Sequence, residues 1–438
     1  MISRTRKQLP LGRPAERVDA RDAGWNIGAP ILLLIFAYFW ISLAPFAAPS
    51  GEQDSASSGS LLNQITVTLL FLIAMTTLGL DPKRRALFAP RGLLLLTLCW
   101  FSFVSIFASD PETAFRRIAY AVLVCGCANA VLLLPRASDE FARLLAIAVA
   151  AVLFLSYFAV IVLPDVGIHR AREVEAALAG DWRGIFGHKN AAAAAMAYVV
   201  LFGLYLRQAT YPKLGTAIAI LAAIFLFFTR GKTASAMLPA ILLLAWMFEH
   251  SRSLRPIVTL GCVAVFNFIL IGLSRSQVTM NLLEGLGIDA TFTGRSEIWA
   301  FTLDRISEQP FTGYGFQSFW YSNRQGEETT ETWAILAAHS HNSFLEALLN
   351  AGVPGLLMIV VWLLVLPLRD ASSAFSTGND PALTRLFLRI WIFSILLACL
   401  ESLFFVNTGP LWFTMLVAVF GMRLQARASL STGVPPSH

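Results

Sequence analysis

Long apolar stretches are the feature of this sequence that most restricts its fold. A helix that crosses a bilayer needs about 20 mostly apolar residues, and by that criterion we find about twelve candidate spans. Only 14% of the residues are charged, whereas a soluble domain carries about a quarter. We therefore predict an all-α, polytopic integral membrane protein. The predicted spans are 29–48, 61–80, 92–108, 116–134, 141–163, 190–206, 213–229, 233–249, 256–273, 351–368, 386–405 and 410–424.

The distribution of basic residues predicts the orientation of these spans. The loop 81–91 is rich in Lys and Arg, whereas the loops 49–60 and 109–115 contain neither. Because Lys and Arg favour the cytoplasmic side, we place both termini in the cytoplasm. The predicted divisions are a cytoplasmic segment 1–28, spans one to nine at 29–273 with an outer loop 164–190, a large outer loop 274–341, spans ten to twelve at 342–424, and a cytoplasmic tail 425–438.

The net charge of +6 does not indicate a nucleic-acid partner, because the basic residues lie in short loops rather than in one cluster. Some of them nevertheless fall on the predicted outer face, against the topological bias. Positive charge in that position is suited to binding an anion. These residues include Arg183, Lys189, Arg230, Lys232 and Arg295.

The segment 338–355 carries the strongest chemical signal. His339, His341, Asn342 and Glu346 lie where the large loop re-enters the membrane. If a helix begins near Asn342, then Asn342 and Glu346 share one face, and His341 at its start can orient or deprotonate a hydroxyl. The alternative is an Asn that caps the helix beside interfacial histidines. We predict no metal or other cofactor, since the sequence lacks an Asp-x-Asp pair and a further His or Cys nearby.

Arg230 and Lys232 lie in a short turn between spans seven and eight, on the predicted outer face. Ionisable groups at this depth usually face the protein interior or a water-filled cavity, although snorkelling at a helix end is an alternative. Arg295 begins a predicted amphipathic helix, 295–307, where a phosphate would meet a guanidinium and free N–H groups. The alternative for Arg295 is a salt bridge to Glu297 or Asp304.

A basic and aromatic segment, Trp182–Asn190, precedes span six. Its Arg183, His188 and Lys189 suit a sugar phosphate, because charged groups meet the phosphate while aromatic rings stack on sugar faces. An interfacial aromatic belt with a helix cap is the competing interpretation. Glu401 falls inside the predicted span eleven, where it is expected to neutralise a buried Arg.

Together these segments resemble the superfamily of O-antigen ligases and polymerases of the bacterial envelope. That family's motif is H-[NSQ]-x9-G-x-x-[GTY], and it is matched by His341-Asn342, nine residues, and Gly352–Gly355. The segments G-R-x-x-x-W at 294–299 and P-x-x-G-x-G at 310–315 also resemble the family's large periplasmic loop. The segment W-R-G-x-F-G-H-K-N at 182–190 is most similar to the exopolysaccharide polymerase branch, of succinoglycan type. The resemblance covers about 163–421 and implies a GT-C-like architecture.

The resemblance implies a metal-independent, inverting glycosyltransferase in the bacterial inner membrane. Its donor would be a glycan linked to undecaprenyl diphosphate, and its acceptor a glycan or the lipid A core of lipopolysaccharide. Arg230, Arg295 and His341 would be catalytic. Lys232, Arg183, His188, Lys189, His339, Asn342 and Glu346 would contact substrate, and His339 is an alternative base. Membrane lipids and polysaccharide assembly proteins are the expected partners.

We favour an exopolysaccharide polymerase over an O-antigen ligase, although the two differ mainly in the acceptor. A polysaccharide transporter or flippase is the alternative from another class, because about a dozen spans is a common transporter arrangement. The late position of the large loop argues against two matching halves. A non-catalytic member of an assembly complex is a third alternative.

Overall fold

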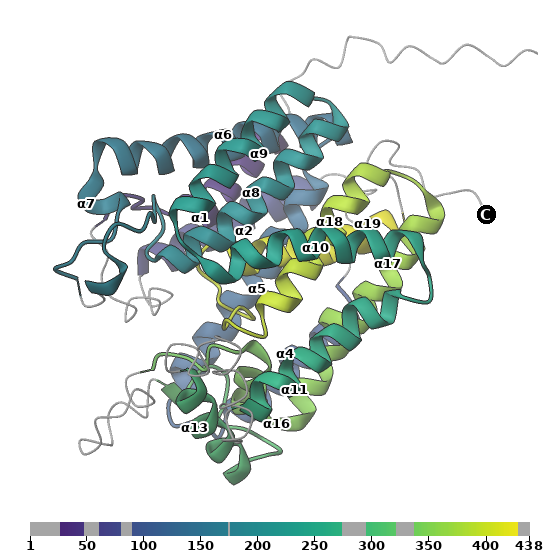
Figure 1. The fold of residues 1–438 in the computed structure, drawn as a ribbon. Coiled ribbons are helices and arrows are strands. Elements are labelled where there is room, and N and C mark those ends of the chain that lie inside the picture. Colours follow the sequence, from purple (N-terminus) through teal and green to yellow (C-terminus); the bar gives the residue numbers. More distant parts are fainter. Residues whose placement is uncertain are drawn as a thin grey trace, which may run out of the picture.

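The computed structural model describes residues 27–47, 61–79, 90–173, 176–273, 295–320 and 337–427. Within these ranges the regular structure is helical (Figure 1), and the only strand-like pairing is an isolated antiparallel bridge between Ile168 and Trp182. The predictions for 1–26, 48–60, 80–89, 274–294, 321–336 and 428–438 lie outside the described residues. They include most of both terminal segments and much of the large loop.

The helices follow the order α1 (Gly28–Trp40), α2 (Leu61–Gly79), α4 (Gly92–Ser105), α5 (Pro111–Leu133), α6 (Ser138–Val162), α7 (Pro164–Gly167), η3 (Ala176–Leu178), α8 (Lys189–Ala209), α9 (Pro212–Phe228), α10 (Lys232–His250), η4 (Ile257–Gly261), α11 (Cys262–Leu273), α13 (Arg295–Glu308), α16 (Ser343–Val360), η5 (Val361–Val365), α17 (Leu366–Thr377), α18 (Pro381–Leu397) and α19 (Pro410–Gln425).

The described helices support a multi-pass membrane protein. Six helical segments are long and apolar enough to cross a membrane by length and composition, and the longest of them covers Ser343–Thr377. The surface carries large apolar side chains, among them Phe227, which is 75% exposed, and Phe268, which is 80% exposed. Such side chains suit a lipid environment better than water. The number of spans and their orientation remain predictions.

Every predicted span overlaps a helix, but the bounds of span eleven are wrong. Helix α18 ends at Leu397, so Glu401 lies in the loop 398–409 between α18 and α19, and not within a helix. The apolar run continues past the helix because Phe404 and Phe405 are buried in that loop. Their ring centroids lie 6.0 and 4.9 Å from the centroid of Trp412. The part of the run that follows α18 is therefore apolar because it packs against the protein interior.

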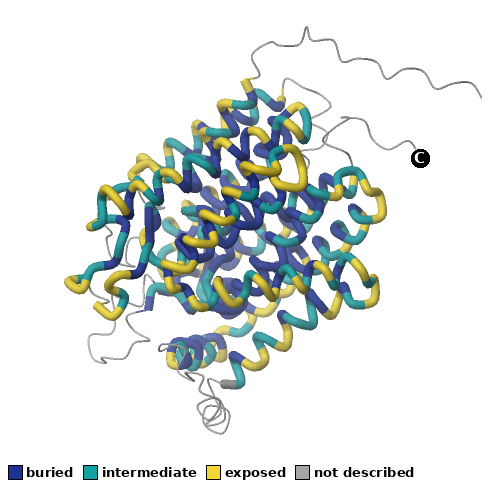
Figure 2. Tube along the Cα trace, turned by 45° about the horizontal axis from the view of Figure 1, so that its top comes forward, coloured by how far each residue is buried: buried dark blue, intermediate teal, exposed yellow. Residues whose placement is uncertain are grey.

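Buried residues fill the centre of the helical bundle, and exposed ones form its outer surface (Figure 2). Helices α8 and α9 form a tight hairpin that depends on two glycines. A Cβ at Gly203 would lie 2.7 Å from the Ala219 nitrogen, and one at Gly215 would lie 2.3 Å from the Arg207 nitrogen. Small residues permit such close approach of helix backbones in membranes. Helix α9 of this hairpin ends at Phe228, directly before the turn that carries Arg230.

Candidate functional site

Glu401 joins Arg295 and His341, two residues that the sequence singles out within the large loop and at its end. Arg295, at the first position of α13, donates from Nη2 to Glu401 Oε1 at 2.7 Å and from Nη1 to the Leu400 carbonyl at 2.5 Å. His341 Nδ1 lies 3.3 Å from Glu401 Oε2. Three segments distant in sequence therefore meet at one carboxylate. We call Arg295, His341 and Glu401 the α13–α16 cluster.

The polar side chains of this cluster are largely buried in the protein. The side chains of Arg295, His341 and Glu401 are 14%, 16% and 21% exposed. Burial alone would raise the pKa of Glu401, but the positive charge of Arg295 and the hydrogen bond with His341 overcome this effect and lower the pKa to about 2. Glu401 is therefore a carboxylate at neutral pH.

The backbone at His341 has an unusual conformation. Its φ of 51° lies in the left-handed region, which is uncommon for a residue other than Gly. The backbone N–H of His341 donates to His339 Nδ1 at 3.3 Å, and the two imidazole rings meet edge to face at 4.0 Å between centroids. His339 is thus a close neighbour of His341, whose Nδ1 faces Glu401. Strained backbone of this kind is often found at functional sites.

Asn342 caps the helix that follows. Its side-chain oxygen accepts from the N–H groups of Phe344 and Leu345, which begin α16. Its amide nitrogen donates to the Cys399 carbonyl at 2.9 Å and to Asn267 Oδ1 at 2.9 Å. The capping interpretation of Asn342 fits these contacts. The same residue attaches the start of α16 to the α18–α19 loop.

The next residue, Ser343, fixes that loop more firmly. Its hydroxyl donates to the Glu401 carbonyl at 2.8 Å and accepts from the Leu403 N–H at 2.7 Å. Its backbone N–H donates to the Ala398 carbonyl at 2.8 Å. Ser343 therefore holds the backbone of the loop on which Glu401 lies.

Two tryptophans support the segment that precedes His341. Trp299, which is fully buried on α13, donates from its indole N–H to the Ser340 carbonyl at 3.0 Å. Glu346 accepts from the Trp320 indole at 3.1 Å and from the Ser340 N–H at 2.9 Å. Glu346 is thus engaged by the protein itself. The amphipathic helix predicted at 295–307 is confirmed as α13, with Trp299 and Ile306 on its buried face.

A break in α16 explains why the His motif requires a glycine at position 352. Gly352 has φ 62° and ψ −170° within the helix, and a Cβ there would lie 2.2 Å from the Phe311 carbonyl oxygen. The break frees carbonyl groups that would otherwise bond along the helix. The carbonyls of Leu349, Asn350 and Ala351 accept from the Tyr314 N–H, the Gly315 N–H and the Trp100 indole at 2.8, 3.1 and 2.9 Å.

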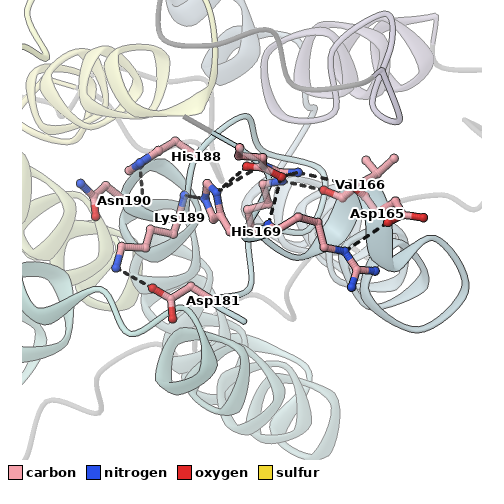
Figure 3. A network of polar contacts seen from close by, with 10 residues as sticks. Asp165, Val166, His169, Asp181, His188, Lys189 and Asn190 are labelled. Carbon is pink, nitrogen blue, oxygen red and sulfur yellow. Dashed lines mark hydrogen bonds and ion pairs between the residues drawn. The ribbon is translucent and has the colours of Figure 1, made fainter. Parts of the chain in front are cut away.

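The second predicted basic site forms around Asp181, whose contact with Lys189 is drawn in Figure 3. Lys189 donates to Asp181 Oδ2 at 2.6 Å, and Arg230 donates to Oδ1 at 3.2 Å. Asp181 is buried, whereas the Arg230 side chain is 70% exposed. Arg230 has φ 51° in the turn between α9 and α10. Asp181, Lys189 and Arg230 form what we call the Asp181 cluster.

Arg183 has a different environment from its neighbours. It is 1% exposed, and its guanidinium donates to both oxygens of Glu173 at 2.8 and 2.9 Å and from Nε to the Val166 carbonyl at 2.7 Å. His169 Nδ1 lies 3.0 Å from Glu173 Oε2. Burial lowers the pKa of His169, with Arg183 and His188 acting in the same direction. Arg183 therefore holds the loop between α7 and α8 together.

His188 caps α8, because its Nδ1 accepts from the Asn190 N–H at 3.2 Å. Lys232 is exposed at the first position of α10. Within the described residues, Arg230 and Lys232 make no hydrogen bond or ion pair with Arg295 or His341. The structure thus groups the predicted residues into two clusters rather than one.

Part of the chain is similar in sequence to a known protein family. Residues 215–360 match the O-antigen ligase family. The matched segment is about a third of the chain. It contains Arg230, Lys232, Arg295 and the His motif, whereas Glu401 lies beyond its end.

Two curated proteins are similar to parts of the chain. The exopolysaccharide production protein ExoQ of Rhizobium meliloti is 28% identical over 104 residues, which are 23% of this chain and 24% of ExoQ. A putative polysaccharide ligase of Rickettsia felis is 26% identical over 124 residues, which are 27% of this chain and 30% of that protein. The chain therefore matches about a quarter to a third of the length of these relatives.

From the sequence, Glu401 is predicted to neutralise a buried Arg, and its ion pair with Arg295 confirms this. The sequence did not identify Asp181 as the partner of Lys189 and Arg230, or Glu173 as the partner of Arg183. The sequence did indicate that Glu401 has a charged partner, because an acidic residue in a long apolar run requires one. Its expected partner was an unnamed Arg, and the expected partners of Arg295 were Glu297 and Asp304. The pair that forms, Arg295 with Glu401, is separated by 106 positions along the sequence. A separation of that length leaves no periodic pattern from which the pair could be predicted.

Proposed function

We propose that the chain is a glycosyltransferase of polysaccharide biosynthesis that acts at the outer face of the bacterial inner membrane. The meeting of Arg295 and His341 at Glu401 supports this proposal most strongly. An imidazole held by a buried carboxylate is an arrangement suited to general base catalysis. The match to the O-antigen ligase family and the name of ExoQ support a role in building a surface polysaccharide.

In this proposal His341 accepts the proton of the acceptor hydroxyl. With Nδ1–H donating to Glu401, the Nε2 lone pair is available to take that proton. The acceptor oxygen then forms a bond to the anomeric carbon, with inversion. The bond from that carbon to the diphosphate breaks, and its electron pair leaves with the lipid diphosphate. Glu401 stabilises the imidazolium that results.

We assign the donor diphosphate to Arg230 and Lys232, with Arg295 contributing positive charge near the reacting bond. The exposed guanidinium of Arg230 suits phosphate oxygens, and charge held in place stabilises a leaving group as it departs. This scheme uses fixed cations and no metal ion. The donor would be a glycan linked to undecaprenyl diphosphate.

Polymerisation of an exopolysaccharide is the activity that we propose first, and the similarity to ExoQ supports it. Transfer of O-antigen to the lipid A core is the second candidate, and the similarity to a putative polysaccharide ligase supports that one. Both reactions use the same bond-forming step with different acceptors. Assembly proteins of the polysaccharide pathway are the partners we expect, with both termini of the chain in the cytoplasm.

A deletion strain complemented with wild type, His341→Ala and Arg295→Ala tests the proposal, with the membrane abundance of each protein measured by immunoblot. We expect the variants to be present in the membrane and to make no high-mass polymer. Loss of exopolysaccharide with normal lipopolysaccharide would support the polymerase. Loss of O-antigen from lipid A, with accumulation of lipid-linked polymer, would support the ligase. Full polymer from His341→Ala would exclude His341 as the base.

A further inference from the structure

The loop that precedes α8 is attached to the end of α9. The backbone N–H of Trp182 donates to the carbonyl of Phe228, the last residue of α9, at 3.1 Å. The two rings also stack, with their centroids 4.5 Å apart and an angle of 20° between their planes. Asp181 directly precedes Trp182 in the sequence, so these contacts place it beside the turn between α9 and α10.

The backbone of Asp181 is held within its own loop as well. Its carbonyl accepts from the His169 N–H at 3.0 Å, and its N–H donates to the Leu178 carbonyl at 3.0 Å. The antiparallel bridge between Ile168 and Trp182 lies next to it. Asp181 is 3% exposed. The carboxylate of Asp181 therefore projects from a backbone that is fixed on both sides.

Two cations share this carboxylate, one on each oxygen. Lys189, the first residue of α8, binds Oδ2 and is 16% exposed, whereas Arg230 binds Oδ1 through Nη1 and is 70% exposed. A guanidinium has five N–H donors, and the contact with Asp181 uses one of its nitrogens. Asp181 thus restrains the exposed Arg230 side chain and leaves donors of the guanidinium for a second anion.

We propose that Asp181 is a positioning residue for the donor diphosphate, which it serves by holding the Arg230 guanidinium in the orientation that receives phosphate oxygens. This role rests on the function proposed above, in which Arg230 binds the diphosphate. Ordering a long, exposed side chain costs conformational entropy, and a side chain that is already restrained loses less of it on binding. Asp181 therefore favours donor binding through Arg230.

The charge of Asp181 has the opposite effect on the donor. A carboxylate repels a diphosphate placed nearby, so electrostatic repulsion alone predicts that Asp181→Asn lowers the KM for the donor. Positioning of Arg230 predicts that the same substitution raises it. The sign of the change in KM consequently separates the two effects.

A double-mutant cycle on the purified full chain tests this role, with kcat and the KM for the lipid-linked donor measured for wild type, Asp181→Asn, Arg230→Gln and the double variant. We expect Asp181→Asn to raise KM about threefold to tenfold, as for one weakened charge-assisted contact. The double variant should have the KM of Arg230→Gln, because Asp181 acts through Arg230.

Asp165→Asn is the matched control and should leave KM unchanged. Asp165 belongs to the same loop, but its side chain is 69% exposed in its pair with Arg172. Gel filtration of each variant establishes that it is folded before kinetics are compared. If Asp181→Asn is not recovered folded, Asp181→Glu takes its place in the cycle, and its change in KM should likewise vanish in the Arg230→Gln background.

A KM in Asp181→Asn that is equal to or below that of wild type would overturn the positioning role. Multiplication of the two single effects in the double variant would also overturn it, because Asp181 would then act independently of Arg230. If Arg230→Gln raises KM and Asp181→Asn does not, only the positioning role fails. An unchanged KM in Arg230→Gln would remove the assignment of the donor to Arg230 together with the role of Asp181.

Discussion

Arg295 and His341 occupy opposite oxygens of one carboxylate. Arg295 bonds to Oε1 of Glu401 at 2.7 Å, and His341 lies 3.3 Å from Oε2. A change at either residue therefore alters the environment of the other through Glu401. Effects of substituting the three residues should be strongly non-additive, as expected for groups that act together.

The lowered pKa of Glu401 predicts a specific dependence of stability on pH. A carboxyl whose pKa falls from 4.5 to about 2 on folding stabilises the folded protein fully above pH 4.5. This stabilisation is lost as the pH falls toward 2. Thermal unfolding in detergent should therefore show a larger loss of Tm on acidification for wild type than for Glu401→Gln. Equal losses would show that Glu401 is not held as a carboxylate by its neighbours.

His341→Asn should abolish most of the activity while leaving the fold intact. Asn tolerates the left-handed conformation at this position but has no basic nitrogen. We expect a loss of about 10²–10⁴-fold in the rate of glycan transfer, which is the usual contribution of a general base. His339→Ala should retain activity within about tenfold. The reverse result would make His339 the base, and transfer from purified lipid-linked donor measures both.

Arg230→Gln should weaken binding of the donor. Loss of one charge-assisted contact to a diphosphate costs about 1.5–3 kcal/mol, so we expect KM for the lipid-linked donor to rise about tenfold or more. Lys213→Gln is the matched control, because Lys213 is exposed near the start of α9, at the opposite end of that helix from the turn that carries Arg230. An unchanged KM in Arg230→Gln would remove this residue from the donor site.

Arg183→Ala should destabilise the protein more than Arg172→Ala. Arg183 is 1% exposed and bonds to both oxygens of Glu173, and removing one partner of a buried pair costs about 3–5 kcal/mol. Arg172 is 78% exposed in its pair with Asp165, and such surface pairs contribute about 0–1 kcal/mol. Thermal unfolding of the two variants gives the comparison. Similar Tm values would argue against the structural role of Arg183.

Gly352→Ala should destabilise the protein more than Gly378→Ala, because both its backbone conformation, with ψ −170°, and its close neighbours exclude a side chain. Both glycines have positive φ, at 62° and 65°, but only Gly352 lacks space for a Cβ. We expect Gly378→Ala to cost about 1–2 kcal/mol and Gly352→Ala to cost about 3 kcal/mol or more, because the clash is with backbone. The yield of folded protein after detergent extraction and its Tm measure the difference. Comparable stability would mean that the loop at Phe311 can move away.

Local features of this chain could be predicted from the sequence with good accuracy. The helix that begins at Arg295 ends at Glu308, one residue beyond the predicted end. Asn342 caps α16 as its residue type suggests. Both depend on contacts within a few residues, and periodicity and capping preferences record such contacts.

Relationships between distant segments could not be predicted in the same way. The apolar run 386–405 was interpreted as one span, but it combines a helix with a buried loop, so the predicted placement of Glu401 inside a helix was wrong. Arg183 was predicted to face substrate, whereas the structure surrounds it with Glu173, Val166 and His169. Hydropathy reports that a segment avoids water. It does not distinguish contact with lipid from contact with protein.

The break at Gly352 divides α16 into two mechanically separate parts. The carbonyls before the break accept from Tyr314, Gly315 and Trp100, so the first part of α16 is joined to the segment that follows α13 and to α4. The part after the break continues toward η5 and α17. A change in bilayer thickness that tilts the later part can be taken up at Gly352. The spacing between Arg295 and His341 would then stay constant in membranes of different lipid composition.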